Sequence, residues 1–212
     1  MNNGIVSDAV CVFASCVLVA MSLIAVIEEF KASYEVVTGF FCAFICLGPL
    51  LLRRKGVFEL PLTLVILIEV AIFLHGYGVL LMRYDDLLFW DTLTHIISSL
   101  TVSLCVFYAL MAVNIFDPMV RIPRKFMPFI IVLIGLAFGA FWESFEFVVD
   151  ELTGTHMQYS PWDTVRDLVC DVVGAAVIGI YSYFYLGRKS EEEFIEGLKI
   201  HPKAGRIAKS RG

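Results

Sequence analysis

The chain has 212 residues, of which 59 % are hydrophobic, and its mean hydropathy is +0.82. Because about half of the residues of a soluble globular domain are apolar, this composition excludes that class and predicts a polytopic membrane protein. The net charge of −5 comes without an extended basic groove, which argues against nucleic-acid binding.

Six apolar stretches are each long enough to cross the hydrocarbon core as a helix, which needs roughly 20 residues. We therefore predict an all-α bundle of about six transmembrane spans within residues 1–187. Gly48-Pro49 in the second stretch is expected to kink that span or end it early. The predicted spans cover residues 9–27, 35–52, 57–82, 89–112, 126–149 and 165–187.

The basic residues predict how these spans are oriented. Thirteen of the sixteen lie in the second and fourth interspan segments and after the sixth span, and the other three are Lys31, Arg83 and Arg166. The positive-inside rule makes the basic side cytoplasmic, so both termini are expected in the cytoplasm of a cell-membrane protein. The opposite side is rich in Asp and Glu, whose field attracts cations.

Residues 188–212 differ in composition from the spans. Ser190 and Glu193 form a capping-box pattern, and Phe194, Ile195 and Leu198 form a short apolar stripe. We predict a small cytoplasmic amphipathic helix followed by a basic tail. The tail has two readings: it is attracted to anionic lipid, or it only anchors the topology.

Ionisable residues recur at helical spacing in three of the predicted spans. Three or four residues separate neighbours within each set, so each set shares one helical face, and all three sets fall at similar depth toward the outer side. A charge in the bilayer is costly, and these faces must meet protein, water or a cation. The residues are Asp91 and His95, Glu143 and Glu146, and Asp163, Asp167 and Asp171.

Carboxylates with one imidazole suit a divalent cation such as Mg, Ca, Mn or Zn, and all seven residues are candidate ligands. His95, Glu146 and Asp167 are also candidates for proton transfer in a reaction. Two alternatives remain open: an ion-pair network with Arg166 or Arg83, and neutral carboxylic acids that share protons. Asp163 has a further reading as an N-terminal helix cap, which does not apply to Asp171, two turns deeper.

Two other features of the spans carry predictions. Glu69 lies near the middle of the third span with His75 toward its outer side, which indicates either a proton relay toward the acidic residues or a protonated carboxyl bonded to a neighbouring helix. Gly135 and Gly139, with the small residues Gly174, Ala175 and Gly179, predict close packing of the fifth and sixth spans. The six cysteines fall in apolar runs, where thiols behave as small buried hydrophobes.

The ordered motifs resemble those of a known family. The segments FWDTLTHIISS, GAFWESFEF and PWDTVRDLVCDVVGAA, within residues 84–180, resemble the YjdF-like family of prokaryotic membrane proteins of undetermined function. More distantly, the pattern is similar to the VanZ-like family, associated with glycopeptide tolerance. The resemblance implies an integral membrane protein with a polar intramembrane centre, and implies no particular reaction.

Three classes of function fit these observations. The first is a metal-dependent enzyme that acts on a lipid or lipid-linked phosphate head group. The scarcity of basic residues near the acidic faces argues against it, since phosphate sites usually recruit Arg or Lys. The second is a cation or proton transporter, although no inverted repeat is evident. The third is a binding or structural membrane protein whose carboxylates only hold the helices together.

Overall fold

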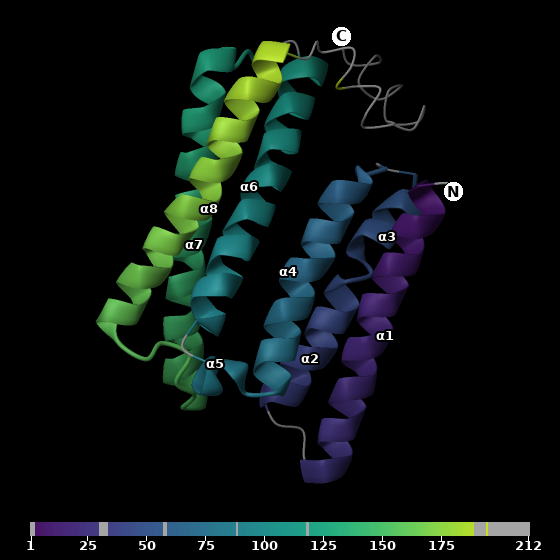
Figure 1. Ribbon diagram of the computed structural model, residues 1–212, viewed down its shortest axis with the longest axis vertical. Helices are drawn as coiled ribbons and strands as arrows, with labels where there is room; N and C mark the ends of the chain where they lie inside the picture. The colour runs from purple at the N-terminus through teal and green to yellow at the C-terminus, as the bar shows by residue number, and fades with distance from the viewer. Residues whose placement is uncertain are drawn as a thin grey trace. The chain divides into compact units, whose positions relative to one another are not determined.

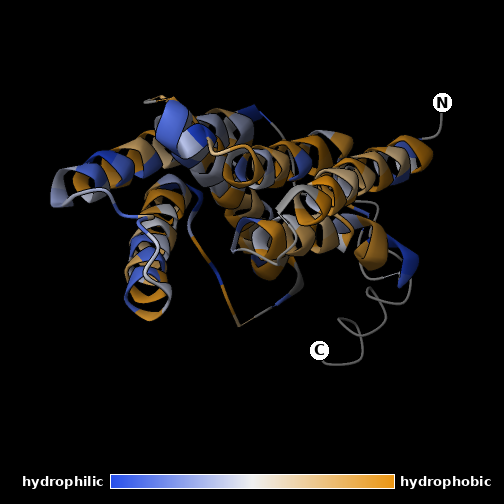
Figure 2. Cartoon of the chain, turned by 90° about the horizontal axis from the view of Figure 1, so that it is seen from below, coloured by the Kyte–Doolittle hydropathy of each residue, from blue (hydrophilic) through white to orange (hydrophobic). Residues whose placement is uncertain are grey.

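The computed structural model describes residues 3–29, 34–56, 59–87, 89–117 and 119–188, together with Phe194. All regular elements within these residues are helices (Figure 1). Six of the helical segments are long and apolar enough to cross a membrane, and Figure 2 shows hydrophobic residues on the helices, interspersed with hydrophilic ones. The all-α, six-span prediction is confirmed. The six segments are Asn3–Ile27, Tyr34–Arg54, Leu62–Leu80, Trp90–Ile115, Arg124–Thr153 and Pro161–Arg188.

The chain divides into two compact units, Met1–Trp90 with Ser190–Gly212, and Asp91–Lys189. The described residues of the first unit include α1 (Asn3–Glu29), α2 (Tyr34–Ile45), α3 (Gly48–Arg54), α4 (Leu62–Leu80) and α5 (Arg83–Asp86). The second unit contains α6 (Trp90–Phe116), the 3₁₀ turn η1 (Arg124–Phe126), α7 (Met127–Thr153) and α8 (Pro161–Arg188). The predicted amphipathic helix at 190–199 and the basic tail lie, apart from Phe194, outside the described residues.

In the first unit, small side chains let α1 and α2 pack closely. Their core consists of Ala14, Leu18, Cys42, Ala43 and Cys46, all buried. The second span is broken as the sequence predicts: α2 ends at Ile45 and α3 begins at Gly48, with Pro49 in its first turn. Proline is tolerated there because the first N–H groups of a helix have no intrahelical acceptor.

Glu69 is a buried acid of the first unit. Its side chain is only 3 % exposed, and neither carboxylate oxygen has a hydrogen-bond partner of normal geometry among the described residues. The thiols of Cys11 on α1 and Cys46 next to α2 lie beside it. The nearby His75 instead places Nδ1 2.9 Å from the hydroxyl of Tyr84, within the same unit. A proton relay from Glu69 through His75 stays a prediction.

In the second unit, glycines bring α8 against both of its neighbours. A Cβ atom on Gly135 of α7 would lie 2.7 Å from the Cβ atom of Ala175, and one on Gly179 would lie 3.3 Å from the carbonyl oxygen of Pro128. A Cβ atom on Gly174 would come within 2.6 Å of the carbonyl oxygen of Ile96 on α6. The predicted close packing of the fifth and sixth spans is confirmed, and α6 also comes close to α8 at Gly174.

Candidate functional site

Residues four apart on the helices of the second unit form buried stripes that are polar at one end. On α6 the stripe runs through Asp91, His95, Ser99 and Ser103 before it becomes apolar at Phe107. A matching stripe on α8 begins with three aspartates, and the one on α7 ends with Glu143 and Glu146. Because the polar ends coincide, the seven predicted residues gather in one cluster, which we call the acidic–histidine cluster: Asp91, His95, Glu143, Glu146, Asp163, Asp167 and Asp171.

His95 is at the centre of this cluster and has a carboxylate at each ring nitrogen. Nε2 is 3.6 Å from Oδ1 of Asp91 and 3.8 Å from Oε1 of Glu143. On the other side of the ring, Nδ1 is 3.4 Å from Oδ1 of Asp171. A carboxylate that accepts from one imidazole nitrogen fixes the ring and its tautomer, so that the other nitrogen can bind a metal. Asp171 is placed for this positioning role.

Three of the cluster residues lie close enough to share one ion. Asp91, His95 and Asp167 each offer a ligand atom, and these atoms all lie within 4.8 Å of one another. Two ligands of a tetrahedral zinc ion, each about 2.0 to 2.1 Å from the metal, are about 3.3 Å apart. The 3.6 Å between Nε2 of His95 and Oδ1 of Asp91 is close to that spacing. Two carboxylates and one imidazole therefore fit a small divalent cation.

Arg166 is the basic residue that the structure places against these acids. Its Nη2 is 2.7 Å from Oδ2 of Asp91 and 2.5 Å from Oδ1 of Asp163, and its Nε is 3.4 Å from Oδ1 of Asp167. The side chain is 40 % exposed, so one edge of the cluster reaches the surface. The sequence offered Arg166 or Arg83 as a counter-charge, and Arg83 instead pairs with Asp86 in the first unit.

The start of α8 is capped by Ser160 and not by Asp163, which is the third residue of that helix. The Ser160 hydroxyl accepts a hydrogen bond from the Asp163 N–H at 3.2 Å, and Oδ2 of Asp163 accepts one from the N–H of Tyr159 at 3.3 Å. Side chains that satisfy the free N–H groups at a helix start stabilise that start. Asp163 pairs instead with Arg166 and lies at the edge of the cluster.

Glu143 and Glu146 are held by side chains that sequence reasoning missed. Gln158, in the loop before α8, donates from Nε2 to the carbonyl oxygen of Glu143 at 2.9 Å and to its Oε2 at 3.1 Å. Trp142 donates from its indole N–H to Oε1 of Glu146 at 2.8 Å. Glu146 also lies within electrostatic range of Glu143, His95 and Asp91. For the Trp142–Glu146 contact, the four-residue spacing of the two residues was a signal that the sequence contained.

Asp150 organises the loop that delivers Gln158. Its carboxylate accepts hydrogen bonds from the Thr155 hydroxyl and the Met157 N–H, each at 2.8 Å, and from the Gln158 N–H at 2.9 Å. The turn itself begins at Gly154, whose φ of +72° favours glycine. Asp150 therefore positions the partner of Glu143.

Asp171 is fixed from three sides. The Ser99 hydroxyl donates to the Asp171 carbonyl oxygen at 2.6 Å, and His95 lies at Oδ1 of the carboxylate. Gly139 of α7 faces the same carboxylate so closely that a Cβ atom there would collide with Oδ2. Gly139 therefore makes room for Asp171 in addition to its packing role.

The cluster holds more acid than its bases can neutralise. Six carboxyl groups face one guanidinium and one imidazole. Oε1 of Glu143 and Oδ2 of Asp171 are buried and have no hydrogen-bond partner within the described part of the chain. Buried charges of one sign that lack partners are strongly unfavourable, so protons or a cation must balance the excess.

Comparison with curated proteins and with solved structures found no significant match. A family model does match, with the description "Predicted membrane protein (DUF2238)", over residues 10–188. That range includes parts of both units and every member of the acidic–histidine cluster. It corresponds to the YjdF-like family whose motifs the sequence resembles. The chain belongs to this family of membrane proteins.

Proposed function

We propose that the protein binds a divalent cation in the acidic–histidine cluster, with Asp91, His95 and Asp167 as ligands. The observation that carries this proposal is the orientation of His95, whose Nδ1 faces Asp171 while Nε2 faces Asp91 and Glu143. In protein metal sites, one imidazole nitrogen typically binds the metal while the other is held by a carboxylate or another hydrogen-bond acceptor. The ligand set suits Zn or Mn better than Ca, which prefers six or more oxygen ligands.

The positive-inside rule supports an outward-facing orientation of the cluster. Arg124 and Lys125 in η1, directly before α7, and Arg188 in the last turn of α8 are at the opposite ends of those helices from the acids. With that side cytoplasmic, both termini are inside and the cluster faces the exterior of the cell membrane. The excess of acid would then attract cations from outside. Similarity to VanZ-like proteins remains a prediction.

A metal-dependent reaction on a lipid or lipid-linked phosphate head group is a second candidate, and Arg166 favours it. Its partly exposed guanidinium lies beside two of the proposed ligands, where an Arg could bind a phosphate. A bound divalent cation supplies polarisation of a phosphoryl oxygen. Because both nitrogens of His95 face carboxylates, Glu146 is the better candidate to carry a proton. Cation transport and a purely structural ion-pair network are the competing accounts.

Cation binding is tested by calorimetric titration of the purified full-length protein with Zn, Mn, Mg and Ca. We expect one ion of at least one of these metals to bind per chain. His95→Gln should weaken that binding by at least about a hundredfold, and Asp171→Asn by about 10- to 100-fold, because Asp171 acts through the ring. His156→Gln, which alters an exposed histidine of the loop after α7, is the matched control and should bind as wild type.

The outcomes separate the accounts. Absence of binding by the wild-type protein, or equal binding by His95→Gln and wild type at unchanged helical content, contradicts the cation site and leaves the structural network. The enzyme candidate predicts phosphate release from phosphatidic acid vesicles that depends on the bound metal. Glu146→Gln should abolish that release and retain cation binding. Phosphate release that persists in Glu146→Gln would exclude Glu146 as the proton carrier.

A further inference from the structure

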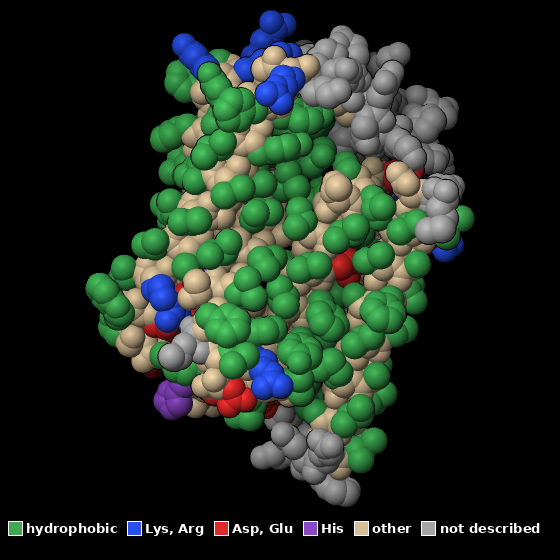
Figure 3. Space-filling model, viewed as in Figure 1, with side chains coloured by type: hydrophobic (Ala, Val, Ile, Leu, Met, Phe, Trp, Pro, Cys, Tyr) green, Lys and Arg blue, Asp and Glu red, His purple; other side chains and the backbone are tan. Residues whose placement is uncertain are grey.

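A hollow lies at the end of the second unit opposite the acidic–histidine cluster. We call it the basic hollow because Arg124, Lys125 and Arg188 line it. It has a volume of about 380 Å³ and lies between η1, at the start of the fifth span, and the last turn of α8. Glu143 follows Met127 by 16 residues, about 24 Å along α7, so the hollow and the cluster are near opposite membrane surfaces. Figure 3 shows basic side chains gathered at this end.

The lining of the hollow combines positive charge with apolar surface. Among its described lining residues there is no carboxylate, and Tyr183, Phe184 and Leu186 supply apolar atoms next to the cations. Tyr183 and Phe184 are largely exposed, as are many other large hydrophobic side chains on the spans. In a membrane this exposed surface meets lipid. A negatively charged group with acyl chains would satisfy both parts of the lining.

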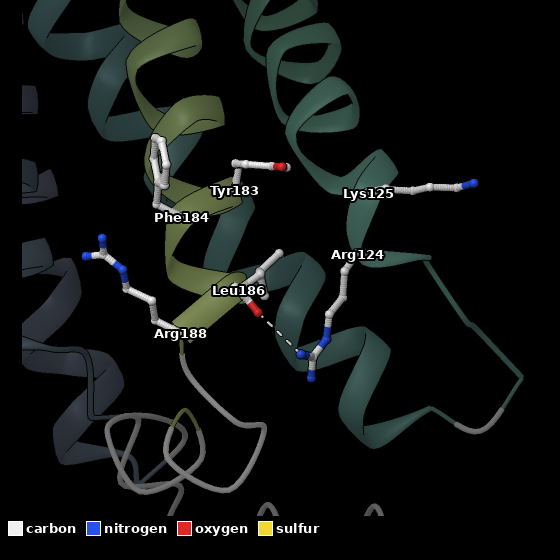
Figure 4. Close-up of a pocket in the computed structure, with 7 residues that line it drawn as sticks. Arg124, Lys125, Tyr183, Phe184, Leu186 and Arg188 are labelled. Carbon is white, nitrogen blue, oxygen red and sulfur yellow. Dashed lines mark hydrogen bonds between the residues drawn. The ribbon is translucent and has the colours of Figure 1, made fainter.

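Helix capping accounts for only part of this charge. Arg124 donates from Nη1 to the carbonyl oxygen of Leu186 at 3.3 Å, a usual arrangement at a helix C-terminus. Figure 4 shows that Lys125 and Arg188 extend away from this hydrogen bond on opposite sides. Lys125 lies 5.1 Å from the centre of the Phe126 ring. Neither is needed to cap α8, and together they widen the positive surface around the hollow.

We propose that the basic hollow binds the phosphate head group of an anionic phospholipid beside Arg124, with Lys125 and Arg188 as cations that flank it on either side and Tyr183 and Phe184 against the acyl chains. The guanidinium groups offer several donors that match phosphate oxygens. Basic residues at a membrane surface attract anionic lipid through the same charge. The site is independent of the proposed cation site, because it shares no residue with it.

Native mass spectrometry of the purified full-length protein, titrated with dioleoylphosphatidylglycerol or with dioleoylphosphatidylcholine, tests the proposal. We expect one retained phosphatidylglycerol and little retained phosphatidylcholine. The triple variant Arg124→Gln, Lys125→Gln, Arg188→Gln should weaken this binding by on the order of a hundredfold, since each basic residue contributes about fivefold. The single variants Lys125→Gln and Arg188→Gln, which keep the Arg124–Leu186 hydrogen bond, should each lose about fivefold and cover the case in which the triple variant does not fold.

The control is a triple variant with the same change of charge at exposed basic residues outside the hollow: Arg54→Gln, Lys55→Gln and Arg121→Gln. It should bind phosphatidylglycerol as wild type. Equal binding of the two lipids, or an equal loss in the control variant, overturns the proposal and leaves only a diffuse basic surface. If millimolar inorganic phosphate displaces the lipid, the hollow recognises phosphate alone, and the proposal that its ligand is a phospholipid is overturned.

Discussion

Arg166 is the residue at which the cation site and the ion-pair network compete. Its guanidinium contacts Asp91 and Asp167, two of the three proposed ligands, and also Asp163. A cation bound to the same carboxylates would be repelled by the guanidinium or would displace it. Because the side chain is 40 % exposed, the guanidinium can swing toward water when a cation takes its place.

We therefore predict that Arg166→Gln tightens divalent cation binding by at least about tenfold. A positive charge a few ångströms from a divalent ion opposes binding by more than about 1.4 kcal/mol, even at an effective dielectric constant of about 20. Without metal, the variant should melt at a lower temperature than wild type, since three carboxylates lose their counter-charge. Calorimetry and thermal unfolding check both effects. Arg83→Gln, with the same charge change in the first unit, is the control, and an unchanged affinity in Arg166→Gln would refute the competition.

Glu69 is a second residue whose burial leads to a prediction. Both of its oxygens lie in a membrane span without a hydrogen-bond partner of normal geometry in the described part of the chain, and its neighbours are thiols. Replacing such a group by an apolar one of similar size removes the cost of its burial. We expect Glu69→Leu to stabilise the protein by about 1 to 3 kcal/mol in thermal or denaturant unfolding. A loss of stability would mean that the carboxyl makes favourable bonds with Cys11 or Cys46.

At the scale of elements, the register between α7 and α8 connects packing to the site. Gly139 has no Cβ atom, and the Asp171 carboxylate occupies the space in which one would lie. Asp171 in turn holds Nδ1 of His95. A change at Gly139, which is outside the proposed ligand set, is thus expected to affect the proposed ligand His95 through Asp171.

Gly139→Ala should lower the stability of the protein by about 1 to 3 kcal/mol and weaken cation binding, because Asp171 or α8 must shift. Gly187→Ala is the matched control on α8, where a new Cβ atom meets nothing within 4 Å. That variant should be stabilised by about 0.5 to 1 kcal/mol through the better helix propensity of alanine. Unfolding and titration of both variants check the pair. If Gly139→Ala behaved like Gly187→Ala, the close approach would be wrong.

The elements of the site differ in how far the sequence could predict them. The spacing of Asp163, Asp167 and Asp171 places them on one helical face, so their gathering with His95 and Glu143 followed from helix geometry and the order of the spans. The break of the second span followed from Pro49, which lacks an N–H group.

Other contacts depend on how two helices slide against each other or on how a loop folds. The sequence pattern of a single helix does not predict that Gly139 faces Asp171, because this contact depends on the register between α7 and α8. Gln158 reaches Glu143 only because Asp150 accepts three hydrogen bonds from the intervening loop. Glu69 meets thiols from two other segments of the first unit. These contacts are tertiary, so single-helix spacing could not predict them.

For the whole molecule, the uneven distribution of basic residues predicts the orientation in the membrane. Single cysteines introduced at Lys55 and Thr155 should react with an impermeant reagent from opposite sides of intact cells, Thr155→Cys from outside. All six native cysteines lie within candidate spans, which limits the background. Labelling of both positions from the same side would contradict a six-span topology with both termini inside.

The central claim is that one cation binds between α6 and α8 in the second unit, and anomalous diffraction tests it most directly. Crystals grown with Zn or Mn should give, at the absorption edge of that metal, a peak about 2.0 to 2.3 Å from Nε2 of His95. The same peak should lie at similar distances from carboxylate oxygens of Asp91 and Asp167. A map without a peak at this position, in which Arg166 still spans Asp91, Asp163 and Asp167, would contradict the claim and establish the ion-pair network in its place.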